Sequence, residues 1–370
     1  MATFDIDTQL HQSSHDKKLF KDKYKSIIYS FKHDIKTLIA YGGGKYKMRH
    51  DLNDIFNNHL TKHNQYDTYV DSFYGMGGSF KALSDSMQRH GVKTVIVNDI
   101  NTCIITMHEN IRNSPIKMTD YFLEFVRTEI IIPYKKFYIP IEDFLDVKQK
   151  MIKRFNELQK KKEFGIETST LMIMLSAFNY SGMLSFRKGG IISFGKPIYE
   201  FDDIDDFFYK TIKRIDIYSE LYNRFDMKFF NSDYFILHKK FKNRKNTLWN
   251  IDPVYLKEDY TKYNMEEMMN FKNSDIKGCV VNYSQKDFNH IGVLDTLKDI
   301  DFIYNNNTSP LLYHYINKFN LEHRLFNRKE NITSAKGAKV KDITEIIIHK
   351  NNFKEPLNNI FDSKPLEKCA

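Results

Sequence analysis

Cysteine is scarce in this sequence, and its distribution argues against a disulfide-stabilised or zinc-stabilised protein. The cysteines of the 370-residue chain form an odd and scattered set: Cys103, Cys279 and Cys369. Such a set does not support a disulfide framework or a zinc site, so we expect a chain that works in a reducing cytoplasm. The spacings His11 to His15 and His59 to His63 lack the adjacent Glu of a zinc-protease helix, and we predict no metal site.

Long apolar runs are absent as well. No stretch approaches the roughly 18 apolar residues that a membrane span needs, and residues 1–20 lack the apolar core of a signal peptide. We therefore expect no membrane association. Apolar residues still make up 41% of the chain and aromatics 15%, which excludes a disordered or fibrous protein. The length is sufficient for one large or two medium domains with a buried core.

Acidic residues are fewer than basic ones. Lys and Arg number 56 against 47 Asp and Glu, a formal net charge of +9. This excess fits a polyanionic partner, but an AT-rich genome, which favours Lys, Asn, Ile, Phe and Tyr, produces a similar composition. Charge alone leaves nucleic-acid binding open, so the motifs must decide.

The first half of the chain contains a strand, turn, helix and strand in succession. A strand-like pattern over 66–73 runs into Gly75-Met76-Gly77-Gly78-Ser79, and a helical pattern follows. A second strand over 92–97 ends in Asn98-Asp99, and 102–112 return to helical spacing. This order predicts a βαβ unit of a parallel sheet.

The middle of the chain differs in character. Charged helical patterns over 143–163 and 202–225 flank a Gly-rich segment, 179–195, which reads as a β-hairpin with its tip near Gly189-Gly190. Strand patterns then resume at 227–230, 247–251, 279–282 and 344–348. We therefore predict a parallel sheet that is interrupted by an insertion.

The glycine cluster and the aspartate that follows it have a clear physical use. Gly75, Gly77 and Gly78 allow a ligand to approach the backbone after a strand, and Asp99 ends the next strand, where a carboxylate can accept both hydroxyls of a ribose. An adenosine-containing ligand fits these features, while a nicotinamide dehydrogenase stays open. The spacing GxGG, in place of GxGxxG, counts against a dinucleotide. The plain alternative is a structural turn with Asp99 as a helix cap.

A second chemical signal lies at the end of the strand over 247–251. The exocyclic amine of a nucleobase is a poor nucleophile, and a site that methylates it must accept hydrogen bonds from its N–H groups. Asp252 and the carbonyl of Pro253 are suitable acceptors, and Tyr255 can stack on the base. Alone, an Asp-Pro-x-Tyr segment is more often a simple strand-ending turn.

Taken in order along the chain, these segments resemble the Dam-type (alpha-group) DNA adenine-N6 methyltransferases. Asn98-Asp99-Ile100-Asn101 is identical to the family's N-D-I-N motif. The resemblance covers about 36–350 and includes the following segments: 41–45, 71–77, 98–101, 179–195, 231–234, 252–255 and 334–349.

The resemblance implies S-adenosylmethionine as cofactor and adenine as the methylated base. It places Lys45 at the cofactor's methionine end, Asp99 at the ribose and Asp233 at the adenine ring. The catalytic residues that it implies are Asp252, Pro253 and Tyr255. The implied cofactor-binding residues are Tyr41, Lys45, Asp71, Phe73, Gly75, Gly77, Gly78, Ser79, Asp99, Ile100, Asp233, Tyr234 and Asp252.

The expected fold is α/β, a Rossmann-like methyltransferase sheet with a mostly helical target-recognition insertion that carries a β-hairpin. We assign 35–112 and 227–350 to the catalytic domain and 113–226 to the target-recognition domain. Residues 1–34 form an N-terminal extension and 351–370 a C-terminal tail.

The expected partner is double-stranded DNA, from which the target base must be flipped out. The candidate DNA-binding residues are Ser181, Ser185, Arg187, Lys188, Lys240, Lys242 and Arg244. Two basic runs, 160–162 and 239–245, are candidate phosphate contacts, although charge runs are more often solvated surface. We prefer the second run because it directly precedes the catalytic strand. A cognate restriction endonuclease is a further expected partner, and the enzyme is expected to be a monomer or weak dimer.

Two departures from the family pattern keep alternatives open. Val254 replaces the second proline of D-P-P-Y; the hydrogen-bond acceptors are kept, so we expect activity to survive. The hairpin is shorter after Phe186 than in GATC-reading members, so that specificity does not carry over. The alternatives are an RNA adenine methyltransferase and an inactive nucleic-acid-binding relative.

Overall fold

The computed structural model describes most of the chain between Leu38 and Lys350. The described residues are 38–39, 45–61, 65–131, 141–177, 184–187, 190–193, 204–256, 288–331 and 340–350. Tyr41, Ser181, Lys188 and the strand predicted at 279–282 lie outside them. Among the described residues, none of the helices has the length and hydrophobicity to cross a bilayer.

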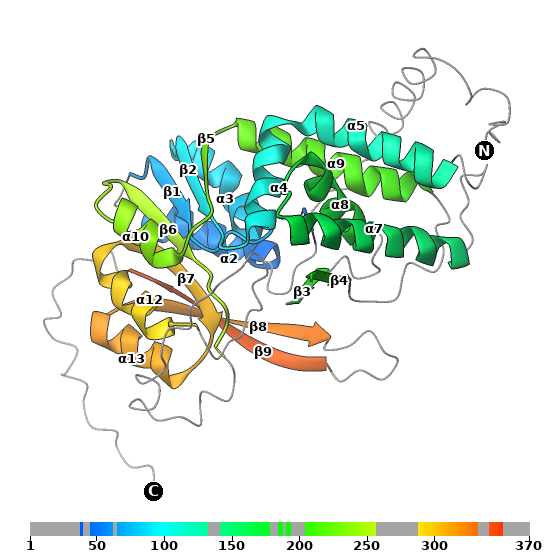
Figure 1. The fold of residues 1–370 in the computed structure, drawn as a ribbon. Coiled ribbons are helices and arrows are strands. Elements are labelled where there is room, and N and C mark those ends of the chain that lie inside the picture. Colours follow the sequence, from blue (N-terminus) through cyan, green and yellow to red (C-terminus); the bar gives the residue numbers. More distant parts are fainter. Residues whose placement is uncertain are drawn as a thin grey trace, which may run out of the picture.

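A seven-stranded sheet forms the centre of the molecule (Figure 1). Its strands, in spatial order, are β5 (Asp226–Phe230), β2 (Thr94–Asn98), β1 (Thr68–Asp71), β6 (Thr247–Ile251), β7 (Asp301–Asn307), β9 (Val340–His349) and β8 (Glu322–Asn331). The first five are parallel, while β9 runs antiparallel to both β7 and β8. The predicted parallel sheet is confirmed.

Helices cover both faces of this sheet. On one face lie α2 (Arg49–Asp54), η2 (Ile55–Leu60), α3 (Gly78–Arg89), α4 (Thr102–Asn113) and α9 (Ile204–Asn223). Packed against α4 and α9 are α5 (Pro115–Val126), α8 (Ile166–Ala177), η3 (Arg127–Ile131) and α7 (Ile141–Lys161), the last two through α5 and α8. On the other face lie α10 (Tyr234–Phe241), α12 (His290–Thr296), η5 (Leu297–Asp299) and α13 (Pro310–Phe319). A short helix, η1 (Lys45–Met48), precedes α2.

Neighbouring residues of one strand pack on opposite faces. Tyr69 lies in the core beside α3 and α4, whereas Val70 lies in the core beside α10 and α12. Burial on both faces explains why the parallel strands read as continuous apolar runs. The first core continues without a break into α5, α7, α8 and α9, so the helices of the predicted insertion share the core of the sheet.

The predicted hairpin is present in the described part of the insertion. Strands β3 (Leu184–Arg187) and β4 (Gly190–Ser193) pair antiparallel, with Arg187 opposite Gly190. They form a separate two-stranded sheet that lies below α7 in Figure 1.

The connections change direction between β1 and β6. From β1 the chain proceeds through β2 to β5 on one side, and from β6 it proceeds to β7 on the other. In open parallel sheets a ligand binds outside the carboxyl ends of the strands at such a switch point. The fold therefore directs attention to the residues that follow β1, β2 and β6.

Candidate active site

Three aspartates meet at the carboxyl edge of the sheet. Asp71 ends β1, Asp99 follows β2, and Asp252 follows β6. Because these strands are parallel and adjacent, with Asp71 in register with Asn250, the three carboxylates gather at the switch point. The sequence predicted all three as site residues, and the fold brings them together.

The glycine turn and Asp99 are joined by hydrogen bonds. Gly75 and Gly77 have φ angles of 50° and 69°, which glycine adopts without strain. The Gly75 N–H donates to Asp99 Oδ2 at 2.9 Å, and the Asn101 N–H donates to Oδ1 at 2.8 Å. Both oxygens of Asp99 are thus oriented by backbone. The helix α3 then begins at Gly78, and Ser79 is buried in its first turn.

Burial raises the pKa values of the carboxyl groups of Asp99 and Asp71. Burial raises the pKa of Asp99 to about 6, against the lowering effect of its two backbone N–H donors. Burial, with a smaller contribution from the nearby charge of Asp252, raises the pKa of Asp71 to about 7. Hydrogen bonds from Asn250 at 3.1 Å and Tyr69 at 3.4 Å partly offset this effect. Two buried carboxyl groups therefore titrate close to neutrality.

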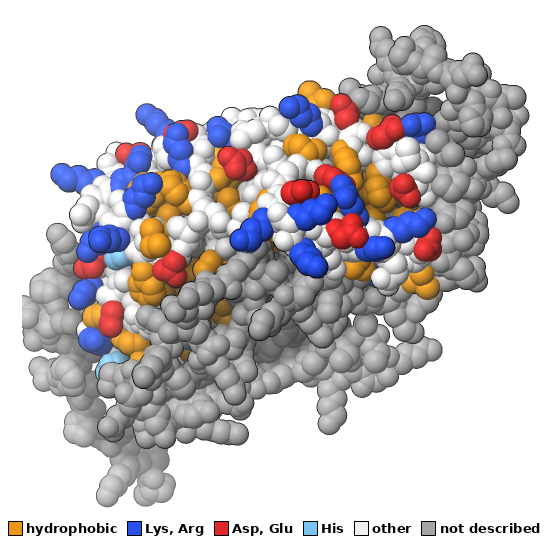
Figure 2. All heavy atoms as spheres, in the orientation of Figure 1, with side chains coloured by type: hydrophobic (Ala, Val, Ile, Leu, Met, Phe, Trp, Pro, Cys, Tyr) orange, Lys and Arg blue, Asp and Glu red, His pale blue; other side chains and the backbone are white. Residues whose placement is uncertain are grey.

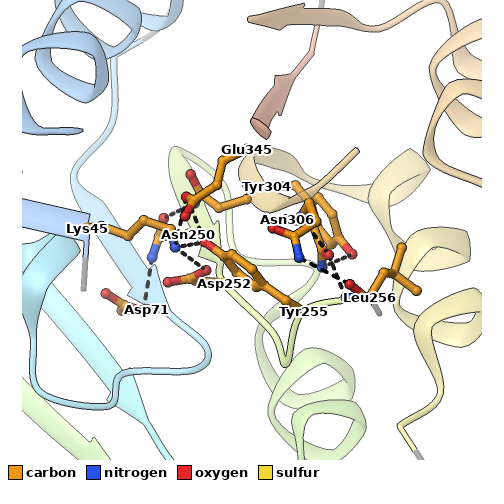
Figure 3. Close-up of polar contacts among 11 residues, drawn as sticks. Lys45, Asp71, Asn250, Asp252, Tyr255, Leu256, Tyr304, Asn306 and Glu345 are labelled. Carbon is orange, nitrogen blue, oxygen red and sulfur yellow. Dashed lines mark hydrogen bonds and ion pairs between the residues drawn. The ribbon is translucent and has the colours of Figure 1, made fainter. Parts of the chain in front are cut away.

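Asp252 and Tyr255 form a cluster with Lys45, as Figure 3 shows. Lys45 Nζ lies 3.0 Å from Asp252 Oδ1, donates a hydrogen bond to the Tyr255 hydroxyl, and lies 4.3 Å from the centre of that ring. The Lys45 side chain is only 1% exposed, so solvent screens its charge poorly and the charge acts strongly on Asp252 and Tyr255. The residue that the resemblance assigned to the cofactor thus also contacts the predicted catalytic segment.

Glu345 of β9 completes this cluster and was not predicted as a site residue. The Tyr255 hydroxyl donates to Glu345 Oε2 at 2.9 Å, and Lys45 Nζ lies 3.6 Å from the same oxygen (Figure 3). Its side chain is 2% exposed. The available signal was a carboxylate within an apolar strand, Ile343-Thr344-Glu345-Ile346, since buried charges occur almost only when paired.

A row of asparagines at the end of β7 fixes the chain after Tyr255. Asn306 Oδ1 accepts from the Leu256 N–H at 2.8 Å, and Asn307 Nδ2 donates to the Leu256 carbonyl at 3.2 Å (Figure 3 shows Asn306 and Leu256). Asn305 Nδ2 donates to Asn250 Oδ1 at 3.3 Å, and Asn250 in turn contacts Asp71. The amides of two adjacent strands therefore position both aspartate-bearing segments.

Phe73 and Tyr234 lie beside the site as a stacked pair. Their ring centres are 5.3 Å apart with 14° between the planes. Asp233 caps α10 by accepting from the Phe235 N–H at 2.7 Å, so the helix occupies one of its oxygens. The Ile100 carbonyl accepts from Asn231, which joins the segments after β2 and β5.

The basic residues predicted to bind DNA lie in two separate places. Lys240 belongs to α10, with Nζ 4.5 Å from the centre of the Phe230 ring, and Lys242 follows that helix. Arg244 Nε donates to Thr68 Oγ1 at 2.9 Å, at the first residue of β1. This is the amino edge, separated from Asp252 by the five residues of β6, about 15 Å. Arg244 therefore lies beside the start of β6 but far from Asp252, which follows the end of that strand.

The remaining candidates lie on the helical side. Ser185 and Arg187 are in β3, although only their backbone is described. Lys160 and Lys161 end α7. Figure 2 shows Lys and Arg gathered over α10, whereas over α5 and α7 they alternate with Asp and Glu. Within the described ranges, no three or more His, Cys, Asp or Glu residues are grouped as a metal site would need.

The groups at this edge of the sheet can accept hydrogen bonds from an amine and can bind a cation. Asp252 and the Pro253 carbonyl are acceptors next to an aromatic ring, and Asp71 and Asp99 are buried carboxyl groups beside a glycine turn. A family model described as D12 class N6 adenine-specific DNA methyltransferase matches residues 41–320. No curated protein matches the chain.

Proposed function

The chain belongs to the D12 class of N6 adenine-specific DNA methyltransferases, and we propose that the carboxyl edge of its sheet performs this reaction with S-adenosylmethionine as methyl donor. Bound there, this cofactor supplies an electrophilic methyl group on a sulfonium that carries its own leaving group. The observation that carries the proposal is the convergence of Asp71, Asp99 and Asp252 at the switch point of the sheet.

The residues at the site fit a cationic nucleoside ligand. Asp71 and Asp99 are buried, their pKa values are raised by burial, and among the described residues neither forms an ion pair. A ligand that brings a sulfonium and an ammonium group relieves this cost. The Ser72 hydroxyl beside them is buried and has no partner in the described part of the chain. We assign the ribose hydroxyls to Asp99 and the methionine end to Lys45, together with Tyr41 of the same segment.

The residues after β6 handle the base. A flipped-out adenine would donate its amine hydrogens to Asp252 and the Pro253 carbonyl, while Tyr255 stacks on the ring. These acceptors direct the nitrogen lone pair away from the ring and toward the methyl group. After transfer the amine loses a proton to solvent or to Asp252. Val254 leaves both acceptors in place, and the amides of Asn306 and Asn307 hold the segment in the absence of the second proline.

We further propose that the enzyme is of the Dam type, because its motifs follow that order. The β3–β4 hairpin is the proposed target-reading element, with Ser181, Ser185, Arg187 and Lys188 facing DNA, and 113–226 the target-recognition domain. A monomer or weak dimer acting on duplex DNA, with a cognate endonuclease as a further partner, completes the proposal.

The test is methyl transfer from labelled S-adenosylmethionine to matched DNA and RNA duplexes, with nucleosides analysed by mass spectrometry. The expected product is N6-methyladenine in DNA. Replacing one acceptor oxygen with Asp252→Asn should lower kcat by a factor on the order of 10³, a much larger change than that in cofactor affinity. Label only in RNA supports the RNA methyltransferase, and DNA binding without label supports the inactive relative; either overturns the proposal.

A further inference from the structure

A chain of buried hydrogen bonds connects α9 to the glycine turn. The Tyr222 hydroxyl of α9 lies 2.6 Å from His108 Nδ1, and His108 Nε2 lies 2.8 Å from the Gly75 carbonyl oxygen. The Tyr74 hydroxyl lies 3.1 Å from the Tyr222 hydroxyl. All three side chains are buried, with His108 and Tyr222 fully so. The ring of Tyr74 packs edge-on against His108, with centres 4.6 Å apart.

The hydrogens of this chain have one consistent arrangement. A carbonyl only accepts, so His108 Nε2 must carry a hydrogen and donate it to Gly75. Burial lowers the pKa of His108 to about 4, so near neutral pH the ring is neutral and Nδ1 carries no hydrogen. Tyr222 therefore donates to Nδ1, and its oxygen accepts from Tyr74. The tyrosine selects the imidazole tautomer that holds the loop.

The bond from His108 reaches the residue that orients Asp99. The Gly75 carbonyl is held by His108 on one side, while the Gly75 N–H donates to Asp99 Oδ2 on the other. Tyr74, the first donor in this series of hydrogen bonds, packs against Gly77. A Cβ atom at Gly77 would lie 2.8 Å from the Tyr74 hydroxyl oxygen. Both positive-φ glycines of the turn are thus supported by this buried group.

We propose that His108 and Tyr222 are positioning residues for the cofactor loop, which set its affinity for S-adenosylmethionine through Gly75. The inference rests on the proposed cofactor site. It gives α9, which lies within the predicted target-recognition segment, a role in cofactor binding. Neither residue touches the ligand; both act through the backbone of the turn.

The chain offers a matched control on the same helix. Tyr218 lies one turn before Tyr222 and is equally buried, and its hydroxyl accepts from the Leu38 N–H at 3.0 Å. Tyr222→Phe and Tyr218→Phe each remove one buried hydroxyl from α9. Tyr222→Phe deprives His108 Nδ1 and the Tyr74 hydroxyl of their partner, and Tyr218→Phe deprives the Leu38 N–H of its acceptor. A merely structural role therefore predicts a loss of stability in both variants and no selective loss of cofactor affinity in Tyr222→Phe. Only Tyr222→Phe breaks the connection to Gly75.

The experiment measures cofactor affinity by calorimetry and steady-state methylation for the full-length variants. For Tyr222→Phe and His108→Phe we expect the Kd and KM for S-adenosylmethionine to rise about 5- to 20-fold, with kcat changed less than about twofold. His108→Gln keeps an N–H donor and should recover most of the affinity, and Tyr218→Phe should bind as the wild type does.

Two outcomes overturn the inference. The first is a folded Tyr222→Phe variant that binds the cofactor as tightly as Tyr218→Phe, with both at wild-type affinity. The second is an equal loss of cofactor affinity in both variants. If His108→Phe does not fold, the pair of tyrosine variants decides. Failure of the wild type to bind S-adenosylmethionine would instead refute the proposed function, so the two failures are distinct.

Discussion

The ionisation of Asp71 and Asp99 should make binding at the proposed cofactor site depend on pH. Their pKa values of about 7 and about 6 exceed the ordinary 3.8, so between pH 4 and 7 the folded protein binds more protons than the unfolded chain. Their contribution to the free energy of unfolding therefore falls as pH rises through this interval. A cationic cofactor favours the ionised carboxylates, so its affinity should rise between about pH 5.5 and 8, with proton release on binding.

Calorimetry in two buffers of different ionisation enthalpy measures both effects. Asp71→Asn should weaken binding and remove the part of the rise near pH 7, while Asp85→Asn, an exposed carboxylate on α3, should change neither. An affinity of the wild type that does not vary over this range contradicts the assignment.

Glu345 is expected to act on turnover through Tyr255. Glu345→Gln keeps an acceptor for the Tyr255 hydroxyl but removes the charge that faces Lys45, so we expect kcat to fall about tenfold. Glu345→Leu removes both interactions and should be slower still. The control is Glu322→Gln on β8, whose carboxylate faces His349. Equal methylation rates for Glu345→Gln and wild type would contradict a role of Glu345 in turnover.

At the scale of residues, sequence reasoning identified the groups that follow strands but not their partners. Asp99 and Asp252 were predicted because each ends an apolar strand in a recognisable motif. Glu345 and Asn306 reach the site only through the pairing of β7 with β9 and of β6 with β7. No local pattern encodes such long-range register, so these partners needed the structure.

At the scale of elements, Gly77 in the turn between β1 and α3 can be compared with Gly91, which follows α3. Alanine at Gly77 or Gly91 costs about 1 kcal/mol from backbone strain, since both have positive φ, 69° and 81°. At Gly77 the new Cβ also meets the Tyr74 hydroxyl at 2.8 Å, whereas nothing lies within 4 Å at Gly91.

Gly77→Ala should therefore lose about 2 kcal/mol or more in urea unfolding and bind the cofactor at least about tenfold more weakly. Gly91→Ala should lose only the strain and keep its affinity. Equal stability and equal affinity of the two variants would argue against a tight turn at the cofactor site.

Strands with apolar patterns were predicted well, and two strands with polar patterns were missed. The strand predicted at 247–251 has the observed bounds of β6, and the predicted helices and strands around the glycine turn are present. β7 was missed because its last residues, Asn305-Asn306-Asn307, look like a turn. β8 was missed because, as an edge strand, it is rich in charged residues.

At the scale of the whole molecule, we expect substitutions in the two basic regions to have different effects on the KM for DNA. Replacing Lys242 and Lys245 with Ala should change the KM for a short duplex less than about twofold, because the segment after α10 reaches the amino edge of the sheet, where Arg244 contacts Thr68, away from Asp252. Replacing Arg187 and Lys188 of the hairpin should raise it about tenfold and reduce its dependence on salt. The reverse result would place the duplex on α10.

The relation of the helical insertion to the sheet was the least predictable feature at this scale. Changes in charge and helical spacing marked 113–226 as distinct, yet Met151, Leu171 and Tyr218 share one core with Tyr69 of β1. Sequence periodicity shows which face of a helix is apolar, but not which surface that face covers.

The central claim is that Asp252 directs methyl transfer to adenine in DNA. The most direct measurement is methyladenine sequencing of DNA from cells that produce either the wild-type chain or Asp252→Ala. The account predicts N6-methyladenine at one recurrent sequence with the wild type and none with the variant. Unmethylated DNA from cells with folded wild-type protein, or the same methylation with Asp252→Ala, would contradict it.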